Sequence, residues 1–583
     1  MTQIDRDTQL ELKGRGTITL APDDFVAAGG EGAVYRHKRT VVKLYHDPDA
    51  AMQSGVIARL ERLSALKHPV LVSPKGSVRD SGGNPIGFYM DHVTGEAFPN
   101  VVNTSFWDRN GFTFADANKV VEQMREPVQL VHAAGACLVD ANLFNWTLAK
   151  SKGGYVPRLF DVDSFIFQDA IPPVVAKMDS IRDWHNELVS PESDWFAWAV
   201  VTFNLFTGIH PYKGGLDGYK KAEMERRMRE NASVFRPGIR LNAAVRDANK
   251  IPSVLRAWYH AVFEQGERSV PPSPFDQPLK SGSTARVLRA TTLAGGTGGA
   301  LRMEKLHDVT NDAAIRVFAC GVVQHASGQL YDLATKQVIG AVTSPECEVV
   351  SVKEGWLIGQ MVDERLRFSF VRKDSLQSEE VSLQTQAFDL VRYENRLFVT
   401  TARGLAELSI RVLGRILLST GNEWGASLNA TRWFDGVGIQ NTMGTSIIIV
   451  PYGANSCAQV RVGELDGLKV VSAKAGNRFI AFVAADKTGQ FFKVGIRFTQ
   501  ENYESWEVTK HPVDQPDLNI AMLPQGVVAS LVEDGELYLL VSASGGHTPV
   551  SDKALTTDMM LANWEQKMVY IQNGAVFRLQ KTA

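Results

Sequence analysis

Residues 138–148 read LVDANLFNWTL, an apolar segment interrupted by three polar residues, Asp140, Asn142 and Asn145. Their spacing fits neither the period of an amphipathic helix nor the alternation of a half-buried strand. Asp and Asn are common in turns because their side chains hydrogen-bond to nearby backbone, so turn chemistry explains each of them singly. The alternative is that all three belong to an active-site loop, and the surrounding sequence bears on that choice.

Length and composition narrow the class of protein. A chain of 583 residues exceeds what one hydrophobic core usually serves, which predicts two to four domains. Lys and Arg number 62 against 64 Asp and Glu, for a net charge of −2, so the chain as a whole carries no electrostatic footprint for nucleic acid or an anionic membrane. No apolar run approaches the roughly 20 residues needed to span a bilayer, and residues 1–16 lack the apolar core of a secretory signal. The four cysteines are scattered without metal-ligand spacing. We therefore expect a cytoplasmic protein with reduced cysteines and neither nucleic-acid nor membrane partners.

The two halves of the chain differ in pattern. Up to about residue 280, strand-like and helix-like segments alternate, and the longest helical stretches are 50–66, 113–134 and 194–206. Residues 268–300 are rich in Pro, Ser and Gly, which favours an irregular connector. These features predict an α+β domain over residues 1–280, a linker over 281–303 and a second domain over 304–583.

The second half is all-β in pattern. Runs beginning at Val349, Leu390, Val470 and Val527 each read as strand, polar turn, strand. They recur at about 40 to 50 residues, the period of four-stranded β-propeller blades, and about six blades would fit. A pair of β-sandwiches would also show short strands separated by turns and stays open as the alternative.

A glycine-rich stretch precedes the opening segment in the chain. Residues 27–46 read AAGGEGAVYRHKRTVVKLYH, with Gly29, Gly30 and Gly32 between two apolar strand-like runs. Such a hairpin can bring backbone N–H groups close to phosphates because no Cβ intervenes, although a simple turn is the alternative. Lys43 lies in the second apolar run, where a cation normally needs a partner.

This stretch resembles the glycine-rich loop of the protein kinase family, G-x-G-x-x-G-x-V. It matches at Gly29, Gly32 and Val34 and departs at Ala27, where the family has its first glycine. The resemblance places Lys43 at the position of the lysine that contacts the ATP phosphates on the third strand.

The same resemblance assigns a partner to that lysine. Residues 53–69, QSGVIARLERLSALKHP, contain one acidic residue, Glu61. In the family, a glutamate of this helix pairs with the lysine, so we expect Glu61 to pair with Lys43 and hold the α and β phosphates. A solvated carboxylate on a helix surface is the alternative reading of Glu61.

The opening segment resembles the family's catalytic loop, H-R-D-L-x-x-x-N, with the same Asp-to-Asn spacing from Asp140 to Asn145. Residues 158–167, RLFDVDSFIF, resemble the metal-binding D-F-G element, with Asp161 as its aspartate. The resemblance implies that Asp140 orients and deprotonates an acceptor hydroxyl, whereas Asn145 and Asp161 hold Mg²⁺ against the phosphates.

Several positions depart from the family pattern. Leu138 and Val139 replace the His and Arg before the aspartate, so no arginine there would receive a phosphorylated activation loop. Asn142 stands where protein kinases commonly have a lysine, and would contact the γ phosphate or the metal. Asp163 replaces the last glycine of D-F-G and would be a metal-side carboxylate or a cap. A purely structural turn is the alternative for Asn142 and for Asp163.

Two further matches lie downstream. Asp194, in a helical segment, matches the aspartate that supports the catalytic loop from beneath. Glu187 and Arg268 match a buried ion pair that ties the activation segment to the last helices.

The combined pattern is similar to a bacterial and phage-type group of eukaryotic-like serine/threonine kinases. It implies a bilobal fold, with an N-lobe over about residues 12–93 and a C-lobe over 94–280, that uses ATP and Mg²⁺ to phosphorylate protein substrates. Members of the group often act alongside a phosphatase and a von Willebrand factor A domain protein, and the C-terminal domain would bind a protein partner or a ligand. A pseudokinase scaffold, a small-molecule kinase and a β-propeller enzyme are the alternatives, although the second half shows no coherent His, Asp or Glu cluster.

Overall fold

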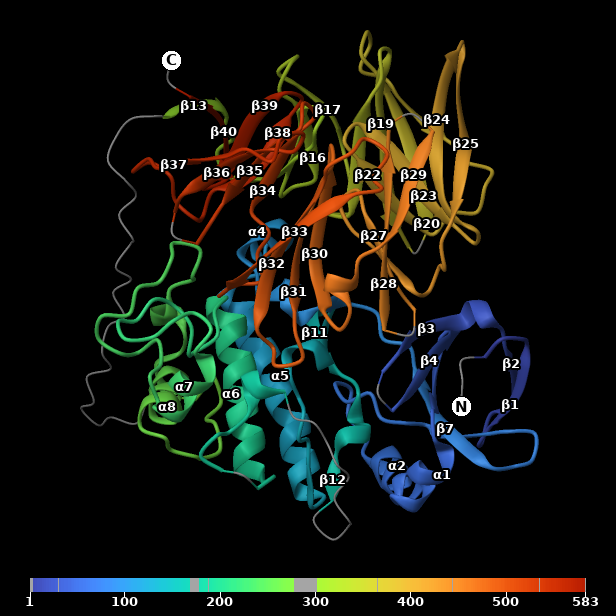
Figure 1. Ribbon diagram of the computed structural model, residues 1–583, viewed down its shortest axis with the longest axis vertical. Coiled ribbons are helices and arrows are strands. Elements are labelled where there is room, and N and C mark those ends of the chain that lie inside the picture. The colour runs from blue at the N-terminus through green and yellow to red at the C-terminus, as the bar shows by residue number, and fades with distance from the viewer. Residues whose placement is uncertain are drawn as a thin grey trace.

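The computed structural model describes residues 4–29, 31–167, 178–186, 188–276, 301–363, 365–442, 444–453, 455–533 and 535–581. Gly30, Glu187 and residues 281–300 of the predicted linker lie outside these ranges, and the side chain of Asp163 is also not described. An α+β part comes first in the chain and an all-β part follows it (Figure 1).

A seven-stranded antiparallel sheet begins the α+β part, in the order β2-β1-β6-β7-β5-β4-β3. Its strands are β1 (Thr8–Leu12), β2 (Gly16–Leu20), β3 (Phe25–Ala28), β4 (Gly32–His37), β5 (Thr40–Tyr45), β6 (Gly76–Arg79) and β7 (Pro85–Asp91). Two short helices, α1 (Pro48–Gln53) and α2 (Val56–Ala65), stand where the sequence predicts one helix over 50–66. The helix is interrupted because Gly55 adopts φ +73, a left-handed conformation that only glycine enters readily.

The rest of the α+β part is mainly helical. Its helices are α3 (Phe98–Val101), α4 (Thr104–Asn110), α5 (Phe114–Ala133), α6 (Pro191–Thr207), α7 (Met224–Arg229) and α8 (Ser253–Glu264). The short strands between them are β8 (Glu96–Ala97), β9 (Ala136–Cys137), β10 (Trp146–Ser151), β11 (Gly154–Leu159) and β12 (Ile166–Phe167). The helices predicted over 113–134 and 194–206 are confirmed as α5 and α6. Helix α6 is buried on every side, as its nearly uninterrupted apolar sequence requires, and forms the centre of this part.

Seven four-stranded antiparallel sheets make up the described all-β part. In chain order their strands are β14 (Ala314–Val317), β15 (Val322–His325), β16 (Gln329–Asp332) and β17 (Gln337–Ala341); β18 (Cys347–Ser351), β19 (Gly355–Val362), β20 (Arg365–Arg372) and β21 (Ser378–Val381); β22 (Asp389–Tyr393), β23 (Arg396–Thr401), β24 (Gly404–Leu413) and β25 (Arg415–Gly425); β26 (Thr431–Trp433), β27 (Gly438–Thr442), β28 (Thr445–Tyr452) and β29 (Ser456–Arg461); β30 (Lys469–Gly476), β31 (Phe479–Ala485), β32 (Phe491–Phe498) and β33 (Trp506–Val513); β34 (Ile520–Leu523), β35 (Val527–Leu531), β36 (Leu537–Val541) and β37 (His547–Val550); and finally β13 (Leu301–His307) with β38 (Met560–Trp564), β39 (Lys567–Gln572) and β40 (Ala575–Lys581). The strand-turn-strand runs predicted at Val349, Leu390, Val470 and Val527 are confirmed.

The number of sheets is one more than the six estimated from the sequence period. The last sheet joins β13 to three strands that lie some 250 residues further along the chain, with β13 antiparallel to β40. A local period cannot reveal a pairing between two distant segments, because the partners share no short-range pattern. Residues 301–303 belong to β13, so this strand begins before the predicted domain start at 304.

Each of these sheets packs against the next through shared apolar side chains. The same packing joins the last sheet to the first, where Val569 and Ile571 share a core with Ala314 and Val323. The seven sheets therefore form a closed ring, in which each sheet packs against a neighbouring sheet on both of its faces. We call this part the sheet ring.

The sheet ring and the helical part share one hydrophobic core. Val471, Val483, Ala485 and Phe491 of the ring lie in the same buried cluster as helices α5 and α6. The long hairpin of β31 and β32 reaches down from the ring toward this part (Figure 1). No helix in the described part of the chain is long and apolar enough to cross a membrane.

Candidate functional site

The loop of residues 138–145 connects β9 to β10. Asp194 of α6 holds it in place. The Asp194 carboxylate accepts hydrogen bonds from the backbone N–H of Leu138 (2.7 Å) and of Val139 (3.1 Å). Its Oδ2 also lies 2.9 Å from Nε2 of His132, near the end of α5. Asp194 is buried, so these three partners replace the water that a carboxylate would otherwise need. The prediction that Asp194 supports this loop is confirmed.

Val139 has an unusual backbone conformation. Its φ is +66, in the left-handed region that a β-branched residue seldom enters, at a cost of roughly 1 to 2 kcal/mol. The Asp194 bond to its N–H holds it there, and the N–H of Asp140 closes a tight turn onto the carbonyl of Leu138 at 2.8 Å. Strained residues of this kind cluster at functional sites, and here the strain directly precedes Asp140.

The three polar residues of the loop form one hydrogen-bonded unit. Asn142 donates from Nδ2 to Oδ2 of Asp140 (3.0 Å) and accepts the N–H of Phe144 at Oδ1 (2.8 Å). Asn145 donates from Nδ2 to the backbone carbonyl of Asp140 (2.7 Å). The other carboxylate oxygen of Asp140 accepts the N–H of Met178 at 3.1 Å. The hydrogen bonds of the two asparagines are typical of turns, and the same bonds also fix the position of Asp140.

Lys43 and Asp161 lie together beside this loop. Lys43 is paired with Val34 across β4 and β5, so the two side chains share one face of the sheet. The ammonium of Lys43 is 3.9 Å from Oδ1 of Asp161 and 3.4 Å from Oε2 of Glu31. The Ser164 hydroxyl contacts the carbonyl oxygens of Asp161 (3.3 Å) and of the loop residue Leu138 (3.4 Å). Ser164 therefore connects the Asp140 loop to the segment that carries Asp161.

The predicted pair between Lys43 and Glu61 is wrong. The Glu61 carboxylate accepts from Lys13 at 2.6 Å in an exposed ion pair, and this hydrogen bond lowers the pKa of Glu61. The reason lies in the register of α2, whose buried face carries Arg59 and Leu60 and leaves Glu61 outside. Arg59 occupies the inward position of α2 and was not among the predicted site residues. The spacing of the buried residues along α2 identifies Arg59 as inward-facing.

Of the two glycines of the hairpin that are described, Gly32 has a structural requirement for glycine and Gly29 has none. A Cβ on Gly32 would lie 2.3 Å from the carbonyl oxygen of Leu44, so the close pairing of β4 with β5 requires glycine there. The N–H of Gly29 donates to the carbonyl of Gly32 at 2.9 Å and closes the turn, and a Cβ on Gly29 would meet open space. Gly30 lies outside the described residues. Strand pairing therefore accounts for glycine at position 32 and does not require glycine at position 29.

Oxygen ligands for a metal are present at two described positions. Asn145 commits its amide nitrogen to Asp140, so its amide oxygen is the end that can ligate a cation. Asp161 adopts a left-handed φ of +62 at the start of a short 3-10 turn, Val162–Ser164, that includes the backbone of Asp163. An amide oxygen and a carboxylate are ligand types that Mg²⁺ accepts. No group of three or more His, Cys, Asp or Glu in the described ranges forms a metal cluster.

A contact from the sheet ring reaches the segment that touches Asp140. The N–H of Ser180 donates to the carbonyl of Thr488, in the β31–β32 turn, at 2.9 Å. The carbonyl of Ser180 accepts from Nε2 of His210 at 2.8 Å, while Nδ1 of His210 accepts the N–H of Tyr212 at 3.2 Å. These two bonds define the neutral tautomer, and burial lowers the pKa of His210 to about 3. Neither the Thr488 turn nor His210 is among the site residues predicted from the sequence.

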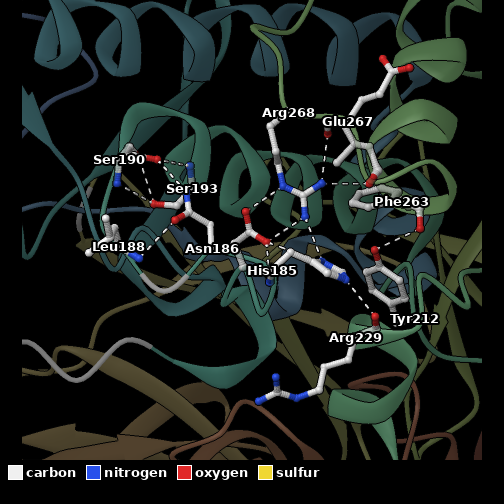
Figure 2. A network of polar contacts seen from close by, with 12 residues as sticks. His185, Asn186, Leu188, Ser190, Ser193, Tyr212, Arg229, Phe263, Glu267 and Arg268 are labelled. Atoms are coloured by element: carbon white, nitrogen blue, oxygen red, sulfur yellow. Dashed lines mark hydrogen bonds and ion pairs between the residues drawn. The ribbon is translucent and has the colours of Figure 1, made fainter.

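A buried ion pair ties this region to the end of the helical part. Arg268 donates two parallel bonds, at 2.7 and 2.8 Å, to the fully buried carboxylate of Asp183. Burial alone would raise the pKa of Asp183, but the bonds and charge of Arg268 lower it. Arg268 also donates to the carbonyls of Val262 and Glu267. Figure 2 shows its guanidinium between Glu267 and His185. The Glu187 predicted for this role lies outside the described residues, and the structure assigns Asp183 to Arg268.

No protein-family model matches this chain, and no match is found among curated proteins. The structure brings Asp140, Asn142 and Asn145 into one loop and places Lys43 beside Asp161.

Proposed function

We propose that the chain is a Mg-ATP-dependent protein serine/threonine kinase. In this proposal the α+β part is a bilobal kinase-like domain, and the sheet ring is a seven-bladed β-propeller that binds a protein partner or a ligand. The observation that supports it most is the loop of Asp140 and Asn145, held by Asp194, with Lys43 and Asp161 adjoining it. Chance turns would not place a carboxylate, a cation and oxygen ligands together in this order.

The residues of the loop have distinct roles in this proposal. Asp140 orients the hydroxyl of a serine or threonine and takes its proton. Asn142 keeps the carboxylate of Asp140 in one orientation, and Asn145 holds the Asp140 backbone through its carbonyl. The ammonium of Lys43 holds the phosphates of ATP next to Asp161. Mg²⁺, held by Asn145, Asp161 and Asp163, would neutralise charge that develops on the phosphates.

A nucleotide-binding or partner-binding scaffold without turnover is the second candidate. It is favoured by the ion pair of Glu61 with Lys13, which differs from the pairing of a helix glutamate with the third-strand lysine that phosphoryl transfer usually employs. Phosphatase and von Willebrand factor A domain partners, suggested by the sequence resemblance, stay predictions for either candidate.

Transfer of radiolabelled γ-phosphate separates the two candidates. With Mg²⁺ and generic protein substrates, we expect Asp140→Asn and Asp161→Ala to reduce incorporation by about 100-fold or more, because each removes a group that acts in the transition state. Asp217→Asn, at an exposed aspartate paired with Arg240, is the matched control and should keep wild-type activity. Equal incorporation in all four proteins would refute the kinase assignment. ATP binding without incorporation by the wild type would instead support the scaffold.

A further inference from the structure

A large cleft separates the first sheet from the sheet ring, away from the loop of Asp140. Its volume is about 1730 Å³, above the range of roughly 300 to 1,000 Å³ typical of small-molecule sites. One wall consists of the turn between β4 and β5, residues 66–75, residues 91–94, and parts of β10 and β11. The other wall consists of residues on β19, β22, β23 and β26, together with Phe388 and residues 428–429. Such a size suits an extended polymer segment better than a metabolite.

The charge of the cleft differs from that of the whole chain. Seven lysines and arginines line it: Arg36, Lys38, Arg39, Lys67, Lys75, Arg158 and Arg432. Three aspartates also line it: Asp24, Asp91 and Asp389. The difference is 7 − 3 = +4, in a chain whose net charge is −2. A cleft of one sign with low-dielectric walls concentrates its potential and attracts ligands of the opposite sign.

The acidic residues only partly compensate for this charge. Asp91 pairs with Lys75 at 2.7 Å, and Asp24 lies 3.2 Å from the ring of His37. Desolvation raises the pKa of Asp389 to about 6, which disfavours its charged form. Lys67 and Arg158 add positive charge on the wall that faces Asp389.

The two walls differ in chemistry. Six of the seven cations come from the first part of the chain, and Arg432 alone comes from the sheet ring. The ring wall carries apolar side chains instead, among them Met361, Phe388 and Trp433, and Phe388 is 40% exposed. An occupant that fits both walls has acidic groups on one side and apolar groups on the other.

We propose that this cleft binds an extended segment of a partner protein in which acidic and apolar residues alternate. In an extended chain successive side chains point to opposite sides, so alternation would face the acids to the basic wall and the apolar residues to the ring wall. A nucleic acid strand is the less favoured occupant, because the chain has a net charge of −2 and carries no electrostatic footprint for a polyanion as a whole. This proposal is independent of phosphoryl transfer, since none of the residues proposed for catalysis lines the cleft.

Fluorescence anisotropy with the full-length protein tests the proposal. The probes are a labelled 12-residue peptide of alternating Glu and Leu, the same peptide with Lys in place of Glu, and a labelled 12-nucleotide oligothymidine. We expect saturable binding of the Glu peptide only, weakened severalfold when salt is raised from about 0.05 to about 0.3 M. The double variant Lys67→Glu, Arg158→Glu should weaken this binding about tenfold or more, because it reverses two charges on the basic wall.

The control variant is Arg411→Glu, Arg415→Glu, which reverses two exposed charges on the β24–β25 hairpin outside the cleft. We expect it to bind the Glu peptide as the wild type does. A second cleft variant, Phe388→Ser on the ring wall, should weaken the Glu peptide but leave its salt dependence unchanged. Circular dichroism and thermal melting of every variant establish that it is folded. Binding of the oligothymidine in preference to the Glu peptide, equal losses in the control, or no binding by the folded wild type would each overturn the proposal.

Discussion

At the residue scale, His210 shows how burial sets a protonation state that the structure depends on. Its side chain is 7% exposed, donates to the carbonyl of Ser180 and accepts from the N–H of Tyr212. A protonated imidazole has no acceptor, so charging His210 would break the bond from Tyr212 and bury an uncompensated cation. The neutral ring is therefore part of what holds Ser180, and through Ser180 the segment next to Asp140.

This burial predicts a loss of stability in mild acid. The pKa of His210 is about 3 in the folded protein and about 6.5 in the unfolded chain, so between these values only the unfolded state gains the proton. Stability is complete above pH 6.5 and falls as the pH drops toward 3, by about 2 kcal/mol at pH 5 from this residue. Urea unfolding at pH 7.5 and pH 5 measures the loss. His210→Gln, which cannot titrate, should show a pH-dependent loss smaller by about that amount, and an equal loss in both proteins would contradict the prediction.

At the element scale, the hairpin of β31 and β32 connects the sheet ring to the candidate site. Its turn contacts Ser180 through Thr488 and its Gln490 side chain bonds to the buried Lys213. Gly489 has φ +85, and a Cβ there would lie 2.1 Å from the Ser180 hydroxyl oxygen. Because Met178, two residues before Ser180, donates to Asp140, a shift of the hairpin would reach the carboxylate through one short segment.

Replacing Gly489 tests this connection. Gly489→Ala adds both left-handed strain and a steric overlap with Ser180, and we expect it to cost about 1 to 3 kcal/mol and to speed hydrogen exchange of the Ser180 N–H. Gly467→Ala is the matched control, because Gly467 also has a left-handed φ, +76, but its Cβ would meet open space. That control should cost only about 1 kcal/mol and leave the Ser180 exchange rate unchanged. Equal exchange at Ser180 in both variants would show that the hairpin does not hold this segment.

At the scale of the whole molecule, a chain of charges crosses five consecutive sheets of the ring. Arg392 on β22 donates to Glu348 on β18 at 2.9 Å and to Asp435, between β26 and β27, at 2.8 Å. Arg316 on β14 extends the chain from Glu348, and Lys474 on β30 extends it from Asp435. Burial would raise the pKa of Asp435, but Arg392 and Lys474 lower it instead. Arg392 is therefore the central member, bound by carboxylates on both sides.

Removal of Arg392 should destabilise the ring strongly. Arg392→Met leaves the Glu348 and Asp435 carboxylates without their shared cation, and we expect a loss of about 3 to 5 kcal/mol in urea unfolding. The matched variant Arg392→Lys keeps a positive charge between the two carboxylates and should lose less than Arg392→Met. Arg461→Met, at an exposed and distant ion pair, should change stability by less than about 0.5 kcal/mol. A larger loss in Arg392→Lys than in Arg392→Met would contradict this account.

The sequence by itself determined the features that depend on neighbouring residues. The periods of the apolar residues predicted α5, α6 and the strand pairs of the ring, because helix and strand burial repeat at short fixed intervals. The spacing from Asp140 to Asn145 predicted one loop, and the structure joins both residues in it. Whether that loop transfers phosphate stays a prediction.

Only the tertiary structure decided which distant residues meet. The register of α2 turned Glu61 away from Lys43, and the partner of Arg268 is Asp183. Strand β13 pairs with β40, although nearly all of the sheet ring lies between these two strands along the chain. The basic cleft likewise combines side chains from residues 24–158 with side chains from residues 361–433. The physical reason is that such contacts depend on how packed elements rotate and approach. One residue along a helix turns the side chain by about 100°, which is enough to move it from the buried face to the exposed one. That information lies in the packing of all the elements together and leaves no short-range pattern in the sequence.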